Sequence, residues 1–201
     1  MTNKYLIEFI SEFWSFCMRI VRFLTLLLLA ATLASCVTTD PRLVSALKQT
    51  SVSQIRVETA PDVTMGGFFN RTKPDPQLPA VVRTLQSTMA RDLTGLPGGP
   101  VKGRLVVTLH TVDVSSKAGR VIAGSDSYIQ GTVRLEDAKT GQLIAEAQSI
   151  RGDDKGVKGG GEIGIVIAMA INAAQSQGED ALAQRLSNSF TRNVKTWLTQ
   201  K

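Results

Sequence analysis

The chain has 201 residues, of which 43% are hydrophobic, and its 23 basic and 17 acidic residues give a formal net charge of +6. The basic residues are scattered singly, which is typical of a solvated surface. This argues against a nucleic-acid partner, because nucleic-acid binding requires a basic stripe or a recognisable module. Two cysteines, Cys17 and Cys36, and one histidine, His110, are too few for a disulfide framework or for a zinc site with the usual ligands.

The first predicted element is a secretory signal helix within residues 1–35. Arg19 and Arg22 give it a positively charged start, and an apolar stretch of about 11 residues follows them. That stretch is too short to cross the roughly 30 Å of a bilayer core as a permanent helix. Since Met18 stands directly before this pattern, translation starts either there or, with a longer leader, at Met1.

The end of the signal carries a second pattern. Leu33, Ala34 and Ser35 lead into Cys36, and this sequence resembles the lipobox of bacterial lipoproteins. The resemblance implies that signal peptidase recognises the three residues and cuts before Cys36, whose thiol carries diacylglycerol with acyl chains such as palmitate. The alternative is an ordinary signal peptide that ends at a chance cysteine. Val37 stands where an aspartate retains enteric lipoproteins in the inner membrane, so the resemblance implies the periplasmic face of the outer membrane.

Residues 36–50 are expected to form the lipid anchor and a short tether. Fully extended, such a segment spans at most roughly 46 Å, and a helical turn between Leu43 and Leu47 would shorten it. The folded domain is then expected over residues 51–201, which is enough chain for one hydrophobic core.

The domain begins with a strand at residues 51–59, because Ile55 and Val57 alternate with polar residues. Residues 61–77 are rich in glycine and proline and predict a loop. A helix with Pro79 in its first turn follows. Its apolar face comprises Leu78, Val82, Leu85, Met89, Leu93 and Leu96, spaced three and four residues apart.

Three further strands are predicted from alternation at residues 105–110, 128–135 and 143–148. A loop is expected around residues 115–127, and the turn at 137–141 joins the last two strands into a hairpin.

A glycine-rich loop at residues 152–161, an apolar run at 163–174 and a final amphipathic helix complete the chain. The apolar face of that helix comprises Leu182, Leu186, Phe190, Val194 and Trp197. The resulting order, β-α-β-β-β-α, predicts an α+β two-layer sandwich with a mainly antiparallel sheet and helices on one face.

The same sequence offers little for catalysis, so we expect no enzyme, no metal site, no cofactor and no small-molecule substrate. His110 alternates with core positions of its strand and is interpreted as a half-exposed strand residue. Asp153 and Asp154 are too few for calcium. Residues 159–164 match G-x-G-x-x-G and Glu179 follows, but a dinucleotide fold would need a further parallel strand after the helix.

The run at 163–174 is the most informative feature outside the anchor. At about 1.5 Å per residue it reaches about 18 Å, too short for a bilayer. Either it is a buried helix on the sheet or it is an interface for self-association or a membrane, with Ile163, Ile165 and Ile167 as contact residues. Phe68 and Phe69 are a second candidate contact, with insertion into the core as the alternative.

Segments 105–109, 131–141 and 159–161, with Trp197-Leu198 at the end, resemble small proteobacterial envelope lipoproteins of unknown function. The layout also resembles the sheet-and-helix domain of lipoproteins that activate peptidoglycan synthases. These resemblances imply a non-catalytic domain, held to a membrane at Cys36, that binds another envelope protein or itself. The alternative is an accessory subunit of an envelope transport, secretion or cell-wall assembly.

Overall fold

The computed structural model describes residues 40–65, 77–177 and 180–201. The signal peptide with Met18, the motif from Leu33 to Cys36, the pair Phe68 and Phe69, and Glu179 all lie outside these residues. The described elements, in chain order, are α2 (Pro41–Lys48), β1 (Thr50–Met65), α3 (Leu78–Leu93), β2 (Val101–Asp113), α4 (Lys117–Ala123), β3 (Ser127–Asp137), β4 (Leu143–Asp154), α5 (Gly161–Gln175) and α6 (Ala181–Leu198).

The four strands form one sheet in the order β1-β2-β3-β4. β1 pairs with β2 in parallel, and the other two pairings are antiparallel. The parallel pairing follows from α3, which lies between β1 and β2 in the sequence and gives the chain room to cross back. The predicted α+β class with a mainly antiparallel sheet is confirmed.

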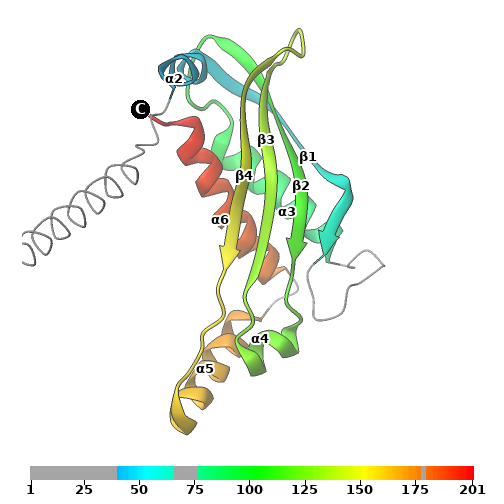
Figure 1. Cartoon of the computed structure of the whole chain (residues 1–201), viewed down its shortest axis with the longest axis vertical. Coiled ribbons are helices and arrows are strands. Elements are labelled where there is room, and N and C mark those ends of the chain that lie inside the picture. The colour runs from blue at the N-terminus through cyan, green and yellow to red at the C-terminus, as the bar shows by residue number, and fades with distance from the viewer. Residues whose placement is uncertain (1–39, 66–76, 178–179) are drawn as a thin grey trace, which may run out of the picture. The chain divides into compact units, whose positions relative to one another are not determined.

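The core lies between one face of the sheet and helices α3 and α6, which run behind the strands in Figure 1. Alternation places one side of β2 and β3 inward, as predicted. Side chains fully buried there include Leu105, Val107, Leu109, Val133 and Leu135 from the sheet and Leu85, Met89, Phe190 and Val194 from the helices.

The turn between β3 and β4 forms where the sequence predicts it. The Asp137 carboxylate accepts hydrogen bonds from the backbone N–H groups of Lys139 and Thr140, each at 2.8 Å. Gly141 follows with φ of +74°, a conformation that glycine adopts without strain. The two backbone bonds, that from Thr140 first, hold the pKa of Asp137 below its usual range.

Helix α2 occupies most of the predicted tether. The side chain of Asp40 accepts a hydrogen bond from the backbone N–H of Arg42 at 2.9 Å and so caps the helix, and Pro41 fits its first turn. Leu47 is fully buried in the core of the domain. The sequence allowed a helical turn here, and the structure shows a full helix over Pro41–Lys48 that packs on the domain.

Two predicted loops were wrong in part. Strand β1 runs on to Met65, because a proline such as Pro61 is tolerated in an edge strand. Helix α4 forms inside the predicted loop at 115–127. Its start is capped by Ser116, which accepts from the Gly119 N–H at 3.1 Å, and its end by Gly124 in the left-handed conformation.

Candidate functional site

Helices α4 and α5 and the loop at residues 155–160 lie beyond the ends of β2, β3 and β4, and together we call them the tip. Figure 1 shows the tip at the opposite end of the sheet from α2 and the C-terminus. α5 packs on α4 and not on the sheet. The tip is therefore an extension of the domain with a small interior of its own.

Helix α5 is an apolar helix that remains largely exposed. Only Ala168 and Asn172 are buried, and Glu162 is the one charged residue in the helix. Five large aliphatic side chains are between 40% and 78% exposed: Ile163, Ile165, Val166, Ile167 and Ile171. A helix that is apolar all round is normally buried. The structure excludes the alternative in which this run packs against the sheet.

The outer side of α5 carries a regular apolar face. Its members are the exposed residues Ile163, Val166, Ile167, Ala170, Ile171 and Ala174, and we call this set the outward stripe. They recur at i, i+3, i+4, i+7, i+8 and i+11, the spacing by which a helix presents one face to a hydrophobic core. Ile163 and Ile167, named from the sequence, belong to the stripe, whereas Ile165 lies on another side of the helix.

The inner side of α5 is held by a buried amide. The side chain of Asn172 accepts a hydrogen bond from the backbone N–H of Val157 and donates one to the Val157 carbonyl, both at 2.9 Å. Because a buried amide without partners is costly, these bonds fix the loop at 155–160 against the helix. The sequence signal for this contact is Asn172 itself, a polar residue within the apolar run at 163–174.

Helix α4 is held by a buried guanidinium. The Arg120 side chain is 1% exposed and lies 2.8 Å from the Asp154 carboxylate, which Arg185 of α6 approaches to 3.1 Å. Arg120 also donates to the backbone carbonyls of Asp154 and Lys155. Burial lowers the pKa of Arg120, and Asp154 opposes this by favouring the charged form. The ion pairs join α4, the end of β4 and α6, which positions the tip.

A close backbone contact fixes the loop beside α4. A Cβ atom on Gly124 would lie 2.6 Å from the Val157 carbonyl oxygen, so only glycine fits there. The Asp126 carboxylate accepts from the Gly156 N–H at 3.0 Å and pairs with Lys158 at 3.3 Å. The Gly156 bond, helped by Lys158, holds the pKa of Asp126 below its usual range.

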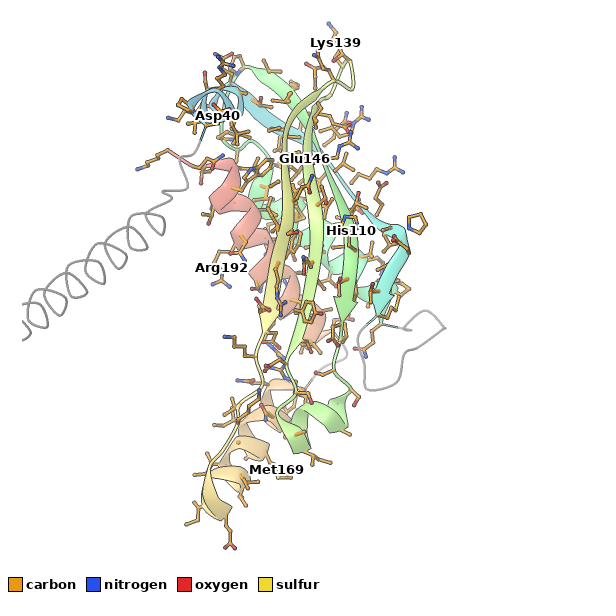
Figure 2. The ribbon with its side chains drawn as sticks, viewed as in Figure 1. Asp40, His110, Lys139, Glu146, Met169 and Arg192 are labelled. Carbon is orange, nitrogen blue, oxygen red and sulfur yellow. The ribbon has the colours of Figure 1, made fainter. Side chains whose placement is uncertain are left out.

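The residues considered for catalysis are dispersed. His110 lies on the uncovered face of the sheet, as Figure 2 shows, with Nε2 2.9 Å from the Thr132 hydroxyl. Asp153 pairs with Arg151, while Asp154 belongs to the contacts of Arg120. Within the part of the chain that the structure describes, no three His, Cys, Asp or Glu side chains lie close enough together to hold a metal ion.

The glycine-rich segment at 159–164 has a packing role. A Cβ atom on Gly159 would collide with the backbone of Gly164, so this glycine lets the loop fold closely onto the start of α5. α5 then packs on α4, away from the sheet, in an arrangement unlike that of a dinucleotide-binding helix. None of the helices in residues 40–65, 77–177 and 180–201 combines the length and apolar character required to cross a membrane.

No family model and no curated protein matches the chain. Solved structures with a similar arrangement include a Caulobacter crescentus protein provisionally described as a lipoprotein, at 14% identity over 79% of this chain and 97% of that one, with a TM-score of 0.29. A PelC variant from Paraburkholderia phytofirmans, described as a dodecamer, is 10% identical over 74% of this chain and 88% of that one, with a TM-score of 0.36. A Xanthomonas campestris protein of the family DUF330 is 12% identical over 74% of this chain and 82% of that one, with a TM-score of 0.33. At these scores no property is transferred to this chain.

Proposed function

We propose that the chain is an envelope lipoprotein, anchored to a membrane through Cys36, whose α+β domain is a non-catalytic module that binds a protein partner through the outward stripe. The exposure of that stripe is the observation that carries the proposal. Soluble monomers rarely leave a large contiguous apolar patch in water, and such patches mark interaction sites. Each large aliphatic side chain that a partner covers contributes about 1–2 kcal/mol of hydrophobic free energy.

The anchor and the stripe would lie at opposite ends of the domain. Cys36 precedes Asp40 by four positions, which span at most about 14 Å, and Asp40 caps α2. The membrane would therefore lie close to the α2 end, with the periplasmic face of the outer membrane as the proposed location. Strand β4 has 12 residues, so about 40 Å of sheet separates that end from the tip.

An accessory subunit of an envelope transport, secretion or cell-wall assembly is the second candidate function. The position of the tip favours it, because Figure 1 shows α5 at the opposite end of the sheet from α2, the helix that follows the proposed anchor in the sequence. In that case the stripe contacts a different protein in a stable complex.

Crosslinking in intact cells tests the proposal, with Ile167→Asp as the disrupting variant. Leu143→Asp is the matched control, because Leu143 is 47% exposed and Ile167 54%, yet Leu143 lies at the other end of the sheet. We expect crosslinked complexes of the wild type to persist in the control and to disappear in Ile167→Asp. Intact-mass measurement should show a mature chain that begins with lipid-bearing Cys36. An unmodified leader, or complexes unaffected by Ile167→Asp, would contradict the proposal.

A further inference from the structure

We infer that a buried chloride ion completes the ion-pair cluster that joins α4, the end of β4 and α6, where it accepts hydrogen bonds from Arg120 and Arg185 beside Asp154. The ligand class is a small monovalent anion. This inference uses neither the anchor nor the outward stripe, so it goes beyond the proposed function and is tested independently of it.

The cluster contains fewer acceptors than its two arginines require. A guanidinium presents Nε and Nη2 along one edge, and that edge fits the two oxygens of one carboxylate. Both arginines turn this edge to the same oxygen of Asp154. Nη2 of Arg120 lies 2.8 Å from Oδ2, and Nε of Arg185 lies 3.1 Å from it. Since one carboxylate cannot accept from both edges in full, a further acceptor is needed.

The donors that remain on these edges are buried. Nε of Arg120 and Nη2 of Arg185 have no hydrogen-bond partner among the residues that the structure describes, and both atoms are shielded from solvent. Other N–H groups of the two side chains donate to backbone carbonyls, from Arg120 to Asp154 and Lys155 and from Arg185 to Gln175. A buried donor without an acceptor is destabilising, and each arginine has one on the edge that faces Asp154.

The charge of the cluster calls for an anion rather than a water molecule. Two arginines share one aspartate, so one positive charge is in excess, and the Arg120 side chain is 1% exposed. Asp126 also acts on Arg120 through its charge, but its two oxygens accept from the Gly156 N–H and from Lys158, which neutralises it. Because a buried charge without a counter-charge is costly, an anion stabilises this arrangement where a neutral water molecule leaves the excess in place.

The burial of the cluster favours a small ligand. Both unpaired atoms are closed to solvent, which favours a single-atom ion over a phosphate group or a side chain of a partner. A chloride ion accepts N–H groups from any direction, so it can serve Arg120 and Arg185 together. The Arg185 side chain is 30% exposed, which gives the ion a route of exchange with solvent. Since chloride would tie α4 to α6, the tip should open less often when chloride is bound.

Hydrogen exchange in two salts tests the site. The purified full chain is compared at neutral pH in sodium chloride and in sodium gluconate, each at about 200 mM, so that surface charges are screened equally and only the size of the anion differs. Protection factors in α4 should be at least threefold higher in chloride, as expected for a dissociation constant below about 100 mM.

Two variants assign that difference to the cluster. Arg185→Gln removes the excess charge and one of the unpaired donors, so it should abolish the difference between the salts. Arg151→Gln is the matched control, because Arg151 also pairs with an aspartate but is 47% exposed, and it should retain the difference. Protection of the strands shows in each variant that the protein is folded.

Crystals grown in sodium bromide locate the ion, because bromide replaces chloride and scatters anomalously. We expect an anomalous peak within hydrogen-bond distance of Arg120 Nε and Arg185 Nη2. A water molecule at that place, equal protection factors in the two salts, or a difference that persists in Arg185→Gln would overturn the inference. A bromide peak without the effect in solution would mark an adventitious ion only and overturn it as well. None of these outcomes depends on whether the outward stripe has a partner.

Discussion

The body of the domain and its tip use apolar and polar residues in opposite ways. In the body, formed by β1–β4 with α3 and α6, the apolar faces meet one another and include the fully buried Phe190 and Leu105. In the tip, the interior includes the polar side chains of Arg120 and Asn172 beside Ala168, and the large aliphatic side chains of α5 are exposed. The comparison shows that an apolar face in a sequence indicates a surface that packs against something. It does not indicate whether the surface packs against another part of the same chain or against a partner.

The largest effect is expected in the body. Phe190→Ala removes a fully buried aromatic ring and leaves a cavity between α6 and the sheet, so the free energy of unfolding should fall by about 3–5 kcal/mol. Urea denaturation measures this loss. A loss below about 1 kcal/mol would mean that this region is not the core described here.

Arg120→Ala should act strongly but locally. It removes the buried guanidinium that joins α4 to Asp154 and the adjoining backbone carbonyls, at a cost of about 2–4 kcal/mol. Since the tip has its own interior, hydrogen exchange should rise in α4 and residues 155–160 while the strands stay protected. Arg192→Ala, at an exposed position of α6 in Figure 2, is the control. It should change neither the exchange of the tip nor the protection of the strands. Uniform loss of protection would contradict an independent tip.

Acid should weaken the contact that Asp126 makes in the tip. The pKa of Asp126 is lower in the folded protein than in the unfolded chain, so its contribution to stability is fully present above the unfolded value of about 3.9 and is lost as the pH falls through the folded value. The protection factor of the Gly156 amide, which is the intrinsic exchange rate at each pH divided by the observed rate, should therefore fall below about pH 4. Asp126→Asn should remove that pH dependence; an unchanged profile in this variant would assign the effect to another group.

The smallest effect on stability is expected at the outward stripe. Ile167→Ala truncates an exposed side chain, so the free energy of unfolding of the purified protein should change by no more than about 0.5 kcal/mol. Thermal denaturation of Ile167→Ala and Phe190→Ala under the same conditions measures the difference between the two losses of stability directly. A loss comparable to that of Phe190→Ala would show that Ile167 belongs to a core.

Much of the body could be predicted from the sequence because its signals are local. Alternation from Leu105 to Leu109 predicts β2, and the three- and four-residue spacing in α3 predicts its buried face. The turn at 137–141 follows from its own residues. The parallel partner of β1 was not predicted, although the helix expected between the strands at residues 51–59 and 105–110 is the kind of connection that a parallel pair needs.

The tip was harder to predict. The capping residues Ser116 and Gly124 are local signals for α4 that the loop prediction missed. The burial of Arg120 depends on Asp154, 34 residues away, and no local pattern indicates it. For α5 the apolar run was recognised together with Ile163 and Ile167, but periodicity alone could not decide whether the helix packs on the sheet or faces solvent.

The account depends most on the outward stripe being covered in the cell and bare in the isolated protein. Thiol labelling of a lipidated Ile167→Cys chain tests this directly, with Leu143→Cys as the control at the other end of the sheet. We predict that the cysteine at 167 reacts with a small maleimide at least tenfold more slowly in intact cells than after purification and dilution, while the control reacts equally in both. Equal rates at 167 in the two states would contradict the account.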